Sequence, residues 1–158
     1  MEFAAPKSRQ IKIINAILLV AFIGSAVGFF LVDRDIWSLI VPLGVMLFVF
    51  GLSYYFSIRK FQITDDEIII VRPFDIEKYP RSNFDKAERV CRKDLRFAIR
   101  TFGIGGVFSY TGQFWNKKFG PMTWYVTNLN NAVILSGANK KIVLSPENPE
   151  KFISKISG

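Results

Sequence analysis

Residues 13–32 read IINAILLVAFIGSAVGFFLV and residues 36–58 read IWSLIVPLGVMLFVFGLSYYFSI, and neither run contains a charged residue. A helix of either length rises roughly 30 Å, which matches the hydrocarbon thickness of a bilayer. A helix in a soluble core does not need to be apolar on every face, and two in succession rarely are. The sequence therefore predicts two transmembrane helices, over 13–32 and 36–58, that form a hairpin.

A cleaved signal peptide is the main alternative for the first run. Its apolar stretch is longer than a typical signal-peptide core, and no good small-x-small cleavage site precedes the charged loop. Within this run, Gly24 and Gly28 form a small-xxx-small step. Such a step allows close packing on the second helix, where Ser38, Gly44 and Gly51 are available, although glycine is also simply common in membrane helices.

The basic residues lie on one side of the hairpin. Its short loop holds one arginine between two aspartates, whereas the flanks carry Lys7, Arg9 and Lys12 before the first helix and Arg59 and Lys60 after the second. The positive-inside rule then predicts a multi-pass protein of the plasma membrane, with both termini and the following domain in the cytoplasm. We expect residues 1–60 to form the hairpin and residues 61–158 to form the cytoplasmic domain.

The second part of the chain alternates short β-prone runs with turn residues. The predicted strands are 61–64, 68–74, 95–102, 122–127, 132–135 and 142–144, with another within 79–90. Short connections favour antiparallel meanders. Near the end, Asn148 suits a helix N-cap and Pro149 the first helical position, and Phe152, Ile153 and Ile156 share one face. About seven strands and one C-terminal helix are the order of a PH-like barrel.

The stretch Arg100–Asn116, reading RTFGIGGVFSYTGQFWN, resembles the signature of a bacterial PH-like domain family. The resemblance continues through Gly120, Trp124–Thr127, Val143–Pro146 and Pro149–Phe152, and it covers roughly residues 61–156. In that family the domain commonly follows two membrane spans. The resemblance thus implies a membrane α-helical hairpin followed by an all-β PH-like barrel with a C-terminal α-helix. Phosphoinositide-binding PH domains generally carry a basic first hairpin, whereas here the turn is the acidic Asp65–Glu67.

The composition leaves little catalytic chemistry. Histidine is absent, and the single cysteine, Cys91, allows neither an internal disulfide nor a multi-thiolate metal site. We expect Cys91 to be a partly buried, inert side chain. The cluster Gly103–Gly106 lacks the Lys and Ser/Thr of a phosphate-binding loop and is expected to bend a strand. Asp65–Glu67 are expected to be solvated turn residues, and we expect no enzyme activity, no metal site and no cofactor.

Two groups of residues are candidate contacts. Aromatic residues are interleaved with lysines in the stretch FWNKKF at 114–119. This pattern suggests that Trp115, Lys117 and Lys118 form a loop that contacts a protein partner or lipid, or else a hairpin loop whose rings pack inward. Despite the net charge of +8, we expect no nucleic-acid partner. In the first hairpin of the domain, the acidic turn lies roughly 13 Å from the bilayer at about 3.3 Å per residue. The return strand then brings Arg72 back toward Arg59 and Lys60, forming a basic collar for anionic head groups.

Two function classes remain. The first is a membrane-anchored, non-catalytic PH-like binding module at the cytoplasmic face that recruits or regulates a protein partner. The second is a structural or accessory subunit of a larger membrane complex, held by its helical hairpin. The lipid bilayer is the expected environment in both classes, and the sequence indicates no oligomeric state.

Overall fold

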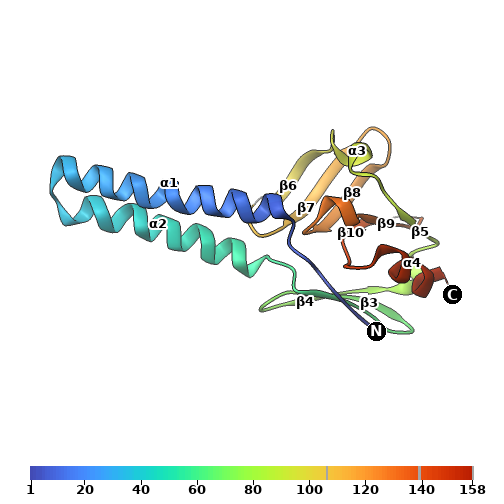
Figure 1. Cartoon of the computed structure of the whole chain (residues 1–158). Coiled ribbons are helices and arrows are strands. Elements are labelled where there is room, and N and C mark those ends of the chain that lie inside the picture. The colour runs from blue at the N-terminus through green and yellow to red at the C-terminus, as the bar shows by residue number, and fades with distance from the viewer. Residues whose placement is uncertain (106, 139, 158) are drawn as a thin grey trace.

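The computed structural model describes residues 1–105, 107–138 and 140–157, and it divides the chain into a helical hairpin and a two-sheet domain (Figure 1). Of the predicted turn and glycine residues, Gly106 and Asn139 lie outside the described residues. The hairpin extends from one side of the domain, and the N-terminus lies within the domain rather than beside the hairpin loop.

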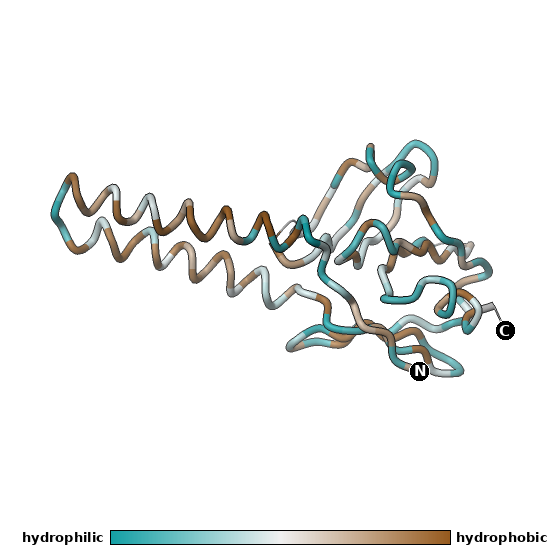
Figure 2. Tube along the Cα trace, in the orientation of Figure 1, coloured by the Kyte–Doolittle hydropathy of each residue, from teal (hydrophilic) through white to brown (hydrophobic). Residues whose placement is uncertain are grey.

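The hairpin consists of α1 (Arg9–Asp33) and α2 (Ile36–Tyr55). Arg34 ends α1 in the left-handed conformation, with φ 53°, and its N–H donates to the Phe30 carbonyl at 2.9 Å. Asp35 then caps α2 by accepting a hydrogen bond from the Trp37 N–H. Both helices are long and apolar enough to cross a membrane, and hydrophobic residues occupy most of their length (Figure 2).

One boundary of the predicted hairpin is wrong, and the structure decides between the two interpretations of its glycines. The second helix ends at Tyr55 rather than at residue 58, because Ile58 is buried in the core of the domain. The glycines do not pack the two helices together, since a Cβ atom built at any of them would meet nothing within 4 Å; they are Gly24, Gly28, Gly44 and Gly51. The small-residue faces are therefore open in this structure.

A four-stranded antiparallel sheet begins the domain, in the order β1 (Glu2–Ala4), β2 (Lys60–Ile63), β3 (Glu67–Val71) and β4 (Ile76–Pro80). Alternate residues of β2 and β3 are buried, as expected for a sheet with one covered face. β1 is not among the predicted strands; it pairs with β2 although α1 and α2 separate the two strands in the sequence. The predicted division at residue 60 assigns β1 to the hairpin, whereas the structure places it in the domain.

The second sheet has six strands, in the order β5 (Lys86–Arg89), β9 (Val133–Ser136), β10 (Lys141–Leu144), β8 (Gly120–Val126), β7 (Tyr110–Asn116) and β6 (Ile99–Gly105). The predicted antiparallel meander is wrong at one pair, because β8 and β10 are parallel. This arises because β9 lies on the far side of β10, where it also pairs with β5.

The core lies between the two sheets, and α4 (Pro149–Ser157) packs against it, which confirms the predicted C-terminal helix. Asn148 accepts a hydrogen bond from the Lys151 N–H at 3.1 Å, as its N-cap role requires. Phe152 is fully buried, and its ring meets the edges of Phe3 and Phe61 with centroids 5.1 and 6.4 Å away. The helix thereby joins the strand that precedes the hairpin to the strand that follows it.

A second apolar cluster covers the outer face of the six-stranded sheet. The segment between β5 and β6 contains the short helix α3 (Arg92–Leu95) and buries Leu95 there. Beneath it, the rings of Phe114 and Trp124 stack at 4.0 Å. The predicted strand 95–102 therefore begins only at Ile99, and Cys91 is exposed rather than partly buried. Single 3₁₀ turns occupy η1 (Arg81–Asn83) and η2 (Leu129–Asn131).

The two sheets and the C-terminal helix give the predicted PH-like arrangement, but the sheets do not close into a barrel, and β4 and β6 are edge strands. Gly103 and Gly112 are paired across β6 and β7, beside a bulge between Arg100 and Phe102. Their φ angles are +126° and +137°, and a Cβ on Gly112 would lie 2.3 Å from the Phe102 carbonyl oxygen. Glycine at this bend was predicted for Gly103, and the structure confirms it.

We expect Gly112→Ala to destabilise the fold by about 2–5 kcal/mol, because it adds backbone strain and a clash that separates β6 from β7. Gly120→Ala is the matched control: Gly120 also has a positive φ, +74°, but nothing lies within 4 Å of its Cβ position, so the cost is about 1–2 kcal/mol. Thermal unfolding of the full chain in detergent measures both. Equal losses for the two variants would contradict the close contact between the strands.

Candidate functional site

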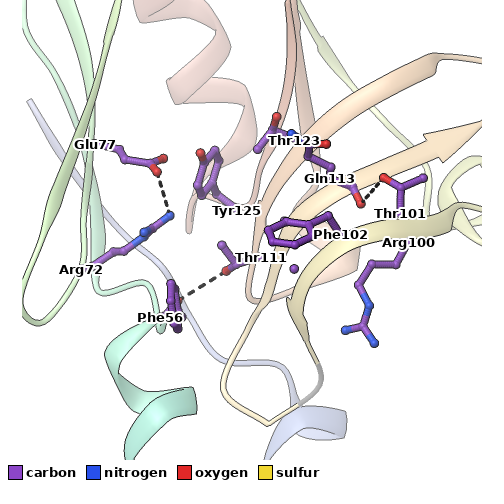
Figure 3. Close-up of a pocket in the computed structure, with 12 residues that line it drawn as sticks. Phe56, Arg72, Glu77, Arg100, Thr101, Phe102, Thr111, Gln113, Thr123 and Tyr125 are labelled. Carbon is purple, nitrogen blue, oxygen red and sulfur yellow. Dashed lines mark hydrogen bonds and ion pairs between the residues drawn. The ribbon is translucent and has the colours of Figure 1, made fainter.

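A pocket of about 680 Å³ opens where the six-stranded sheet extends beyond the four-stranded one (Figure 3). One wall comes from Arg72 and Glu77 of the β3–β4 hairpin, and Phe56 lies at the base, directly after α2. The opposite wall comes from β6, β7 and β8; its main side chains are Arg100, Phe102, Thr111, Gln113, Thr123 and Tyr125. We call this space the inter-sheet pocket.

Arg72 extends from the end of β3 toward the centre of the inter-sheet pocket (Figure 3). Only 7% of its side chain is exposed. Its Nη2 donates to Glu77 Oε1 at 3.1 Å, and its Nη1 lies 3.8 Å from Asp75 Oδ2. The guanidinium also lies over the rings of Tyr125 and Phe56, at 5.5 and 5.9 Å from their centroids. Arg72 is thus a buried cation held by carboxylates and aromatic faces.

Two tyrosine hydroxyls continue this polar network into the core. Tyr79 Oη lies 2.7 Å from Tyr125 Oη and 3.4 Å from Glu77 Oε2. Burial is the main cause that raises the pKa of Tyr125, and the adjacent Glu77 carboxylate and Tyr79 hydroxyl raise it further. Burial also raises the pKa of Tyr79. The network therefore favours the neutral form of both phenols.

The end of α2 is fixed against both hairpins that border the inter-sheet pocket. The Phe56 carbonyl lies within hydrogen-bond distance of the Ser109 and Thr111 hydroxyls, at 3.3 and 3.4 Å. Phe74, in the β3–β4 turn, stacks on Tyr55 with ring centroids 5.7 Å apart. On the other side, Phe108 packs edge-on against both Phe50 and Tyr54. The pocket consequently lies immediately beside the end of the helical hairpin.

The three predicted collar residues are neighbours, but they do not form one exposed cationic surface. Lys60 is opposite Val71 in the β2–β3 register, yet its ammonium pairs with Glu2 at 2.8 Å. Arg72 points into the inter-sheet pocket. Arg59 is exposed and donates to the Tyr54 hydroxyl at 3.3 Å. Among the residues that the structure describes, Arg59 is therefore the only collar residue without an ion pair.

The second predicted group divides between strand and turn. Phe114 and Trp115 are neighbours on β7, but Phe114 is buried and Trp115 is exposed, so the rings do not all pack inward. Lys118 pairs with Asp94 at 2.7 Å, and Lys117 is exposed in the turn. Trp115 is opposite Ile99 on β6. These two residues and two further exposed rings form what we call the edge patch: Phe97, Ile99, Phe102 and Trp115, at 79%, 63%, 76% and 45% exposure.

The acidic residues of the first hairpin occupy the predicted turn. Asp65 and Asp66 are exposed between β2 and β3. Glu67, the first residue of β3, pairs with Lys78 at 3.3 Å, and its N–H donates to the Thr64 hydroxyl. A local hydrogen bond and an exposed ion pair therefore account for the residues at this turn.

Glu77, Tyr79 and Tyr125 are not among the predicted site residues, and Arg72 lies inside the pocket rather than on the predicted membrane-facing surface. A signal was available for Arg72, because Ile68, Ile70 and Arg72 follow the period of two that places alternate strand residues on one face. The inward face of β3 therefore ends in a cation. No comparable pattern pointed to Tyr125, since its partner Tyr79 is distant in sequence and on the other sheet.

The raised tyrosine pKa values predict a stability loss at alkaline pH. Because both pKa values in the folded state lie above the ordinary value of 10.0, the contribution is complete below pH 10 and is lost as pH rises above it. We expect the unfolding temperature of the full chain to fall above about pH 10, and Tyr79→Phe/Tyr125→Phe to weaken that dependence. Phenolate absorbance, measured against pH for the full chain and for the double variant, reports the ionisation of these two tyrosines. If the two proteins already differ in phenolate absorbance below pH 10, the assigned burial is contradicted.

A family model described as a bacterial PH domain matches residues 59–158. The match begins at the junction of α2 with β2 and includes every strand of the domain except β1. No curated protein and no solved structure matches the chain. Since the model covers well over half of the sequence, the chain belongs to the bacterial PH domain family.

Proposed function

We propose that this protein is a membrane-anchored, non-catalytic binding module that recruits or regulates a protein partner at the cytoplasmic face of the plasma membrane. The observation that carries the proposal is the edge patch on β6 and β7. Large apolar side chains gathered on the surface of a soluble domain commonly mark an interaction site. Two helices able to cross a membrane would hold the domain that carries this patch at the bilayer.

The edge patch combines a free strand with a basic border. β6 pairs with β7 on one side and is the last strand of its sheet on the other, so its outer backbone groups are available to an added strand. Arg96, Arg100 and Lys117 border the patch and make no ion pair with the residues that the structure describes. These features fit an extended protein segment that carries apolar side chains and acidic residues.

Site-specific photo-crosslinking in cells tests this proposal. A photo-reactive residue at position 99 is expected to give a discrete product with a partner, whereas one at position 65, in the exposed acidic turn, gives none. Phe102→Ser should reduce the product at position 99 by at least about fivefold, because anchor residues of interfaces commonly contribute more than about 1 kcal/mol. Equal crosslinking from positions 99 and 65 would argue against a partner at the edge patch.

The open glycine faces of the hairpin favour a second candidate, a structural or accessory subunit of a membrane complex. The space beside Gly24, Gly28, Gly44 and Gly51 is unoccupied by the chain itself, and small residues of this kind permit close approach of another helix. In that case the products form from photo-reactive residues in α1 and persist in the Phe102→Ser variant. The same experiment therefore separates the two functions.

The exposed Cys91 provides a direct test of the proposed orientation. It is the single cysteine of the chain, so a membrane-impermeant maleimide should label it only after the cells are permeabilised. A Cys91→Ser/Arg34→Cys variant moves the thiol to the loop between α1 and α2, where labelling should occur in intact spheroplasts. Labelling of Cys91 in intact spheroplasts would place the domain on the outer side.

A further inference from the structure

The inter-sheet pocket contains a buried cation whose hydrogen-bonding capacity is not filled. Arg72 Nε is buried and has no hydrogen-bond partner among the described residues. One Nη2 hydrogen bond goes to Glu77, and the Nη1 contact to Asp75, at 3.8 Å, is longer than a hydrogen bond. Guanidinium groups bind carboxylate and phosphate oxygens through several N–H groups at once. Arg72 is therefore equipped to bind an oxyanion inside the pocket.

The charged residues around the pocket favour an anion with a single negative charge. The charged lining residues are Arg72, Arg100 and Glu77, and the Asp75 carboxylate lies 3.8 Å from Arg72 outside the lining, so the site carries at most one net positive charge. Glu77 also repels a second negative charge beside Arg72. A monoanion, such as a phosphodiester or a carboxylate, fits this balance better than a polyphosphate does.

The remainder of the lining suits an apolar neighbour of the anion. The rings of Phe56, Phe102 and Tyr125 border the space (Figure 3). Gly103 and Gly112 leave bare backbone between β6 and β7, so no side chain fills that part of the wall. A volume of about 680 Å³ is within the usual range for small-molecule pockets. The ligand therefore combines one oxyanion with an apolar portion.

The position of the pocket points to the bilayer as the source. Phe56 follows α2 directly, and Phe74 and Phe108 pack on the last turns of that helix. Phe74 and Phe102 are both largely exposed. Given the proposed membrane anchoring, on which this step rests, these rings lie at the level of the lipid head groups, where aromatic side chains are favoured.

We propose that the inter-sheet pocket binds the monoanionic head group of a membrane phospholipid, with Arg72 as the buried anchor. This site differs from the tip of the first hairpin, which is acidic. It also differs from the predicted basic collar, since Arg72 acts from inside the domain and Arg59 and Lys60 do not line the pocket.

Lipid retention by the full-length protein tests the proposal. The protein is incorporated into nanodiscs of phosphatidylcholine with increasing phosphatidylglycerol and extracted in mild detergent, and bound lipid is counted by native mass spectrometry. We expect saturable retention of about one phosphatidylglycerol per chain. Glu77→Gln, which removes the competing carboxylate, should retain it more tightly, and Arg72→Gln/Glu77→Gln should bind it at least about tenfold more weakly.

The controls separate this site from surface attraction and from failed membrane insertion. Arg59→Gln and Lys60→Gln each remove one positive charge outside the pocket and should leave the saturable retention unchanged. If the double variant does not fold, Glu77→Gln alone decides, since no gain in retention would overturn the proposal. Equal retention by wild type and the folded double variant would also overturn it, as would equal thermal protection by inorganic phosphate. Carbonate extraction of the same membranes reports anchoring independently of lipid retention.

Discussion

The direct junction between α2 and β2 is the constraint on which the rest of the structure depends. Only a few residues separate the two elements, and one of them, Ile58, is buried in the core of the domain. The connection between β1 and α1 is equally short. It is also fixed to the domain, because the Ser8 N–H donates to the Thr127 carbonyl just before α1 begins. With both connections hydrogen-bonded or buried, the domain has little freedom to turn relative to the hairpin. A longer linker would uncouple the two parts.

This constraint explains why the inter-sheet pocket opens beside the end of α2. The β3–β4 and β6–β7 turns both pack on the end of α2, through Phe74 and Phe108. The inter-sheet pocket opens between these turns, whereas α4 packs into the core between the sheets elsewhere. Closing the sheets into a barrel would pair the free edge of β6 and cover the pocket, so incomplete closure creates both surfaces.

The Arg72–Glu77 ion pair of the pocket is expected to contribute little to holding the sheets together. Burying an ion pair such as Arg72–Glu77 removes two charges from water, and the Coulomb attraction seldom exceeds that cost by much. Apolar side chains of similar volume at these positions would extend the core that Ile68 and Ile70 begin. The placement of a guanidinium at the end of that row, beside two phenols, is therefore better explained by recognition of an anion than by stability.

The sequence by itself determined the two apolar helices, the acidic turn, most of the strands and the C-terminal helix, because these depend on local composition and on periods of two or 3.6 residues. It did not reveal β1, whose few residues bind β2 across the whole hairpin, nor the parallel pairing of β8 with β10. The candidate site was decided by tertiary structure alone. Arg72 and Tyr125 lie far apart in the chain, and only the packing of one sheet over part of the other makes them face the same pocket.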